Sequence, residues 1–144
     1  MEKPLEKALE KIRKVLEKRP EVLAAYLYGS HAKGYAREGS DVDVAIMMSP
    51  NFSGDSYKYQ FDLECDVAHA IDDVEVETIL LDNMGYPLKY NASIGGKLFY
   101  SRDDIKRARE EVRIQNERED FGDFFEDLLH YNLEGARRYL NARS

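Results

Sequence analysis

Two short segments separated by a glycine-rich stretch constrain the fold more than any other feature of this sequence. Residues Val22–Tyr28 are a nearly continuous apolar run, and Asp41–Met48 alternates acidic with apolar residues before becoming wholly apolar. Segments of this length and composition are typical of β-strands, and the turn formers of Gly29–Gly34 end the first one. We therefore expect two strands here, the first of them mostly buried.

Amphipathic helices are expected on both sides of these strands. Before Pro20, apolar residues recur at spacings of three and four, which predicts an N-terminal helix. Its apolar residues are Leu5, Ala8, Leu9, Ile12, Val15 and Leu16. A second helix is predicted after the loop Pro50–Asp55. The apolar face expected of this second helix consists of Phe61, Cys65, Ala68 and Ile71, so the cysteine would be a small buried residue.

A third strand and further helices complete the expected order. Residues Val74–Leu81 are typical of a strand, and Pro87 is placed to open a short helix. The densely charged segment Asp103–Arg118 indicates a solvated helix, whereas Phe121–Leu140 carries a wide apolar stripe. This order predicts an α/β (α+β) fold in which helices flank a small β-sheet.

Composition indicates one domain and excludes some classes of binding partner. The 144 residues fit a single domain, with residues 1–100 as its core and 101–144 as a helical extension. The 28 acidic and 21 basic residues give a net charge of −7, so binding along the backbone of a long nucleic acid is not expected. No apolar run approaches the ~20 residues of a membrane span, and no signal-peptide core or cysteine pair is present. We expect a cytoplasmic protein that does not enter membranes.

Asp41 and Asp43 are the first candidate functional residues. Side chains two residues apart on a strand point to the same face, so these two carboxylates lie close together and repel each other. Burying such a pair beside apolar residues is costly without a cation. Paired carboxylates are the oxygen ligands that Mg²⁺ takes together with water and substrate phosphates. The alternative is a solvated edge strand that binds no metal.

The glycine-rich stretch favours the metal-dependent interpretation. Gly29 and Ser30 follow a buried strand, where glycine lets the backbone approach a ligand closely. Successive N–H groups and the Ser30 hydroxyl suit a phosphate, although such a pair is also typical of an ordinary turn. Ser30 lies eleven residues before Asp41, so the phosphate and the cation would be neighbours. A third carboxylate from the next strand would complete the site, and Glu75 and Glu77 are both candidates.

Together these residues resemble the signature of a known family. The motif consists of Gly29-Ser30-His31-Ala32-Lys33-Gly34 followed by Ser40-Asp41-Val42-Asp43. It is similar to the signature of the nucleotidyltransferase superfamily related to DNA polymerase β. Weaker matches along most of the chain point to the minimal, MNT-type branch. The sequence departs from the family pattern at Lys33, where the family has arginine, and at Glu77, where it has aspartate.

The resemblance implies roles for individual residues. It implies a nucleotidyltransferase fold with a nucleoside triphosphate, ATP, as substrate and Mg²⁺ as cofactor. The residues that would bind the nucleotide are Gly29, Ser30, Gly34 and Ser40. The residues that would hold Mg²⁺ and catalyse the reaction are Asp41, Asp43 and Glu77. The extra methylene of Glu77 moves its carboxylate by more than an ångström, a displacement large enough to affect catalysis.

The implied function is transfer of AMP from Mg-ATP to a hydroxyl group. In the MNT-type branch the acceptor is a tyrosine of a partner HEPN-domain toxin, which would make this chain the antitoxin. Two alternatives stay open: an enzyme that nucleotidylates an aminoglycoside, whose positive charge suits an acidic protein, and a non-catalytic antitoxin with a degenerate site. A homodimer is compatible with each. We also expect Phe124, Phe125 and Leu129 to contribute to a partner-binding surface.

Overall fold

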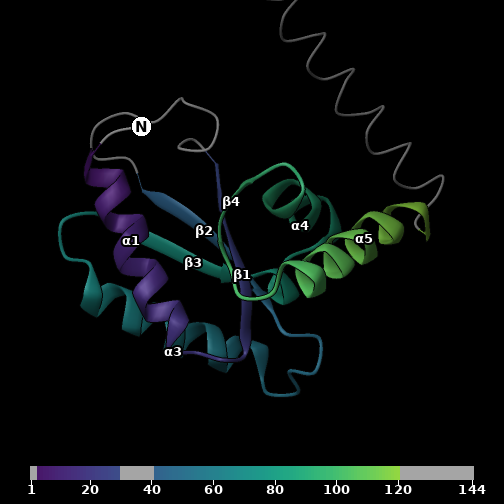
Figure 1. Ribbon diagram of the computed structural model, residues 1–144, viewed down its shortest axis with the longest axis horizontal. Helices are drawn as coiled ribbons and strands as arrows, with labels where there is room; N and C mark the ends of the chain where they lie inside the picture. Colours follow the sequence, from purple (N-terminus) through teal and green to yellow (C-terminus); the bar gives the residue numbers. More distant parts are fainter. Residues whose placement is uncertain (1–2, 30–40, 121–144) are drawn as a thin grey trace, which may run out of the picture.

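The computed structural model describes residues 3–29 and 41–120 (Figure 1). Four strands form one sheet in the order β3-β2-β1-β4. Their bounds are Val22–Tyr28 for β1, Val42–Met48 for β2, Val76–Leu80 for β3 and Lys97–Ser101 for β4. The sheet is mixed, because β2 runs parallel to β3 whereas β1 is antiparallel to both of its neighbours. The α/β fold class with a small mixed sheet is therefore confirmed.

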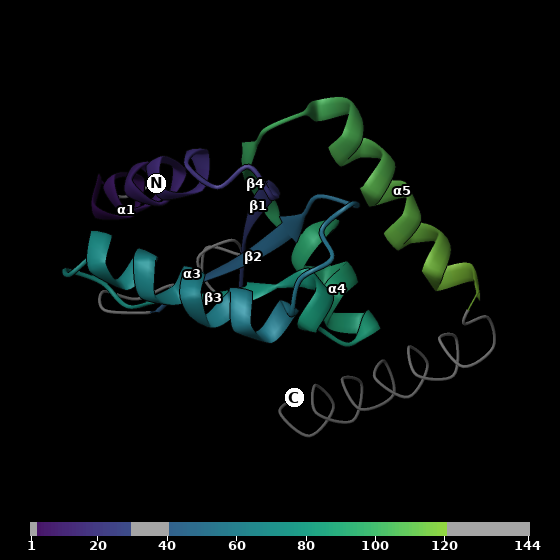
Figure 2. The same ribbon diagram turned by 90° about the horizontal axis from the view of Figure 1, so that it is seen from below.

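Two helices cover one face of the sheet. These are α1 (Lys3–Glu17) and α3 (Ser56–Ala70), which lie side by side in Figures 1 and 2. The N-terminal helix has the predicted apolar face, and Ile12 and Leu16 are fully buried against β1 and β2. Asp55 caps α3 by accepting hydrogen bonds from the backbone N–H groups of the helix's first turn.

The predicted apolar face of α3 is wrong at Phe61, Cys65 and Ala68, which are exposed, and right at Ile71. Leu63 and Val67 are its buried residues, with Ile71 buried directly after the helix. In contrast, Phe61 is 69% exposed, and Cys65 is an exposed free thiol. Leu63, Val67 and Ile71 recur every four residues, so they form an alternative stripe on the same helix. The stripe of Leu63, Val67 and Ile71 therefore packs on the sheet, and the stripe that begins at Phe61 does not.

The opposite face carries α4 (Tyr86–Ser93), α5 (Asp104–Asp120) and a short 3₁₀ turn, Leu81–Asn83. Figure 2 shows α5 on the side of the sheet away from α1. Among residues 104–117 of α5, Ile114 is the one buried side chain. It packs in a core cluster on this face of the sheet that also contains Tyr26, Ala45, Met47 and Ala92. The charged helix predicted over 103–118 is thus confirmed, whereas the apolar stripe 121–140, with Phe124, Phe125 and Leu129, lies outside the described residues.

The fourth strand was not predicted from the sequence. Within β4 no residue is fully buried, and the strand pairs only with β1, at the edge of the sheet. Arg102 follows it and donates hydrogen bonds from its guanidinium to the backbone carbonyls of Leu16, Glu17, Arg19 and Val22. These bonds join the end of β4 to the end of α1. None of the described helices combines the length and the apolar character that a bilayer span requires.

Candidate functional site

Three adjacent strands bring chemically active side chains to one corner of the sheet. Asp43 is the register partner of Tyr28 on β1 and of Glu77 on β3. Side chains at paired positions lie on the same face, with their Cβ atoms about 5 Å apart. Asp43, Ala45 and Met47 are two residues apart on β2, so their side chains share one face of the sheet. Ala45 and Met47 pack with Ala92 of α4 and Ile114 of α5, so this is the face that carries α4 and α5. The fold therefore places the Asp43 and Glu77 carboxylates beside each other.

Gly29 lies against the carboxylate of Asp43. Its φ of 74° is in the left-handed region, which favours glycine. A Cβ atom at this position would overlap Oδ2 of Asp43 and stand 3.3 Å from its Cγ. Glycine thus serves two purposes here, because it allows the chain to turn out of β1 and leaves room for the carboxylate. The space beside the Cα atom of Gly29 is therefore filled by the Asp43 carboxylate.

Tyr28 belongs to the same corner and was missed as a functional candidate. Burial, together with the negative charges of Asp43 and Glu77, raises the pKa of Tyr28 to about 12. The phenol therefore remains protonated at neutral pH and is a hydrogen-bond donor next to two anions. Its position directly before Gly29, two residues from the buried Tyr26, is the sequence signal that could have identified it.

The structure describes only some of the other predicted site residues. Asp41 is exposed and directly precedes β2. Glu75 lies just before β3, whereas Glu77 lies within it. The carbonyl of Glu75 accepts a hydrogen bond from the backbone N–H of Val42 at 2.9 Å. The nucleotide-binding candidates Ser30, Gly34 and Ser40 are outside the described residues. Across residues 3–29 and 41–120, no group of three or more His, Cys, Asp or Glu side chains is gathered closely enough to hold a metal ion.

The donor set of this corner nevertheless fits Mg²⁺. All the candidate ligands are carboxylate oxygens, and Glu77 and Asp41 are exposed, so the corner is accessible to solvent. Mg²⁺ usually keeps several waters and takes only one or two protein carboxylates together with substrate phosphates. A solvent-accessible pair of carboxylates is therefore suited to a cation that arrives with a phosphate-bearing ligand.

Comparison with known proteins identifies the family. The family model described as "Polymerase beta, Nucleotidyltransferase" matches residues 10–105, about two thirds of the chain. The chain belongs to this nucleotidyltransferase family. The matched segment runs from α1 to the start of α5 and contains all three strands that carry Tyr28, Asp43 and Glu77. No curated protein sequence is significantly similar to this nucleotidyltransferase.

Solved structures share the fold of this nucleotidyltransferase at low sequence identity. A chain of a toxin–antitoxin complex with AMP-PNP is 21% identical, with a TM-score of 0.59, and the match covers 84% of this chain and 98% of the other. The toxin–antitoxin structure MntA-HepT is 19% identical, with a TM-score of 0.54 and coverages of 86% and 98%. A structure of the tri-AMPylated HEPN toxin of Shewanella oneidensis with its MNT antitoxin is also 19% identical, with a TM-score of 0.55 and coverages of 86% and 98%.

Proposed function

We propose that this nucleotidyltransferase transfers AMP from Mg-ATP to a tyrosine hydroxyl of a HEPN-domain toxin and so acts as the antitoxin of a toxin–antitoxin pair. The observation that carries the proposal is the register of β2 and β3, which sets Asp43 directly beside Glu77 at the end of β1, where Gly29 lies against Asp43. The acceptor is inferred from the neighbours of similar fold, one of which contains an AMPylated HEPN toxin.

The chemistry assigned to these residues is a displacement at phosphorus. The acceptor hydroxyl oxygen forms a bond to the α-phosphorus of ATP, the bond from that phosphorus to the bridging oxygen breaks, and pyrophosphate leaves. The proton of the hydroxyl passes to the carboxylate of Glu77. Asp41, Asp43 and Glu77 would hold Mg²⁺, which supplies neutralisation of the charge that develops on the phosphate oxygens.

The nucleotide would lie against the end of β1. We assign Gly29, Ser30, Gly34 and Ser40 to the phosphates on the strength of the motif. The protonated phenol of Tyr28 adds a donor that brings no negative charge to a site already occupied by two carboxylates. The triphosphate should bind more tightly beside this neutral donor than it would beside a third negatively charged side chain.

The proposal is tested by three matched variants and a labelled nucleotide. Asp43→Asn should abolish transfer of AMP from α-labelled ATP to the co-purified toxin. Glu77→Gln should lower turnover by about 100-fold or more and change nucleotide affinity much less, because a proton acceptor acts chiefly in the transition state. Glu75→Gln removes the same charge two residues away, outside β3, and should leave transfer unchanged.

Three results would contradict the proposal. A wild-type chain that binds the toxin tightly but never labels it would be a non-catalytic antitoxin. Transfer by Asp43→Asn at the wild-type rate would show that the carboxylates of this corner do not form the active site. Labelling that depends on Glu75 rather than on Glu77 would contradict the role given to the Asp43–Glu77 pair.

A further inference from the structure

Basic side chains lie on two different sides of α1. Lys11 and Lys14 of α1 and Lys18 of the turn after it recur at spacings of three and four, so they form one stripe along the exposed side of the helix. On the other flank, Arg13 donates a hydrogen bond to the carbonyl of Phe99 at 2.8 Å and thereby faces β4. The lysine stripe lies on the side of α1 that is next to α3.

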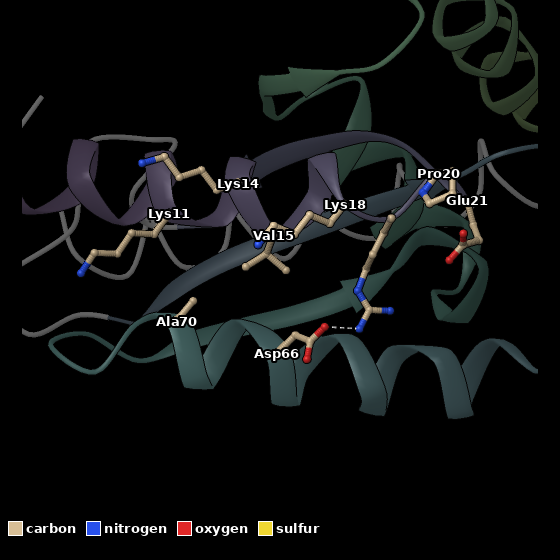
Figure 3. A pocket seen from close by; sticks show the side chains of 9 residues that line it. Lys11, Lys14, Val15, Lys18, Pro20, Glu21, Asp66 and Ala70 are labelled. Carbon is tan, nitrogen blue, oxygen red and sulfur yellow. Dashed lines mark hydrogen bonds and ion pairs between the residues drawn. The ribbon is translucent and has the colours of Figure 1, made fainter.

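A groove lies between this stripe and α3 (Figure 3). Its volume is about 720 Å³, and its walls come from α1, the turn after α1, and α3. Lys11, Lys14 and Lys18 line it, while Val15, Pro20 and Ala70 supply apolar surface. Because α1 and α3 cover the face of the sheet opposite to α4 and α5, the groove is separated from the Asp43–Glu77 corner by the sheet itself.

The acidic residues of the groove are already engaged. Asp66 forms an ion pair with Arg19, whose guanidinium also contacts Asp62 at 3.1 Å. Arg19 stacks over the ring of Tyr59, 5.2 Å from its centroid, and the Tyr59 hydroxyl donates to Glu21 at 2.9 Å.

The three lysines, in contrast, have no ion pair with any side chain in the part of the chain that the structure describes. The lining of the groove thus holds four basic side chains, those of Lys11, Lys14, Lys18 and Arg19, against the two carboxylates of Glu21 and Asp66, in a protein of net charge −7.

We propose that the groove between α1 and α3 binds a small molecule that bears two or more phosphate groups. From Lys11 to Lys18 the helix rises about 10 Å, so the three ammonium groups suit charges spread along a ligand rather than a single anion. Lysine binds phosphate as a point charge, and a volume of this size is usual for small-molecule sites. A long nucleic acid is disfavoured by the overall acidity of the chain.

The experiment uses inorganic tripolyphosphate as the probe and isothermal titration calorimetry as the readout. It is carried out with the full chain in EDTA at physiological salt, so that metal-dependent binding at the nucleotide site is suppressed. The triple variant Lys11→Gln, Lys14→Gln, Lys18→Gln should raise the Kd by about 10-fold or more, as expected for the loss of several charge-assisted contacts. All three lysines are exposed, so the fold should be retained.

The matched control is Lys58→Gln, Lys106→Gln, Arg109→Gln, which changes the net charge equally at exposed positions outside the groove. It should change the Kd by less than about 3-fold, because surface charges at a distance are screened. Asp43→Asn should bind tripolyphosphate as the wild type does, which separates this proposal from the proposed AMP transfer.

A second measurement avoids substitution altogether. Tripolyphosphate should protect Lys11, Lys14 and Lys18 of the wild-type chain from acetylation, detected by mass spectrometry, and leave Lys58 and Lys106 unprotected. Equal Kd values for the two triple variants, uniform acetylation, or absence of binding at physiological salt would each overturn the proposal. Tighter binding of a short single-stranded oligonucleotide than of tripolyphosphate would overturn the assignment to a small molecule.

Discussion

Replacing Gly29 by alanine should separate the stability of this protein from its activity. The residue has a φ of 74°, and an alanine in this region costs about 1–2 kcal/mol of backbone free energy. The new methyl group would also overlap Oδ2 of Asp43, which would have to rotate away from its place beside Glu77. A carboxylate can rotate at little cost in stability, but a displacement of about 1 Å in an active site can lower the rate 100-fold.

The expected result is therefore a small loss of stability and a large loss of activity. At about 1–2 kcal/mol, the melting temperature should fall by about 3–8 °C in a chain of this size, measured by circular dichroism. AMP transfer to the toxin should fall by about 100-fold or more. Gly85→Ala is the matched control, because Gly85 has a φ of −66° and no atom within 4 Å of an added Cβ. It should cost less than about 1 kcal/mol and leave transfer unchanged.

A double-mutant comparison isolates the steric part. In an Asp43→Ala background the overlap disappears, so Gly29→Ala should cost only its backbone component. Because the carboxylate can rotate away at little cost, the loss in the wild-type background should exceed this component by less than about 1 kcal/mol, and a much larger excess would contradict that rotation. Wild-type transfer by Gly29→Ala would refute the argument that Asp43 must keep its place against this glycine.

Two further predictions concern stability. Thr78→Val should raise the free energy of unfolding by about 1 kcal/mol in urea denaturation, because the Thr78 hydroxyl is buried and has no hydrogen-bond partner among the described residues; a loss of stability would indicate a partner for that hydroxyl. Stability should also fall as pH rises from about 10 to about 12, because the unfolded chain loses the Tyr28 proton first while burial holds the folded pKa at about 12. Tyr28→Phe should make this fall shallower, and an unchanged slope would contradict the raised pKa.

The parts of the fold that were predicted correctly are those with one dominant pattern. The first strand has the predicted bounds, Val22–Tyr28, because a continuous apolar run between Pro20 and Gly29 admits little else. In α3 two apolar stripes compete on one helix, and periodicity alone does not decide between Phe61 and Leu63. β4 carries no alternating pattern, because an edge strand with partly exposed residues is not required to have one.

The candidate site was predictable in its residue types but not in its pairing. Glu75 and Glu77 lie on the same face of one segment, so the sequence pattern left both open. The choice depends on the parallel register of β2 and β3, two strands that are far from adjacent in the chain because α3 lies between them. That register pairs Asp43 with Glu77 and leaves Glu75 before the strand. Tyr28 was missed because its importance comes from the charges of two other strands.

The hydrogen bonds of Arg102 have a consequence for the order in which the chain folds. Its guanidinium binds carbonyl groups at the end of α1 and the start of β1, which are 80 to 86 residues earlier in the chain. During synthesis the N-terminal helix and β1 therefore emerge long before the residue that satisfies these carbonyls. β1 also waits for β4, one of its two partners in the sheet. Helix α1 and β1 are made before β4 but gain these contacts only once β4 and Arg102 are present, which favours slower folding than local contacts alone would allow.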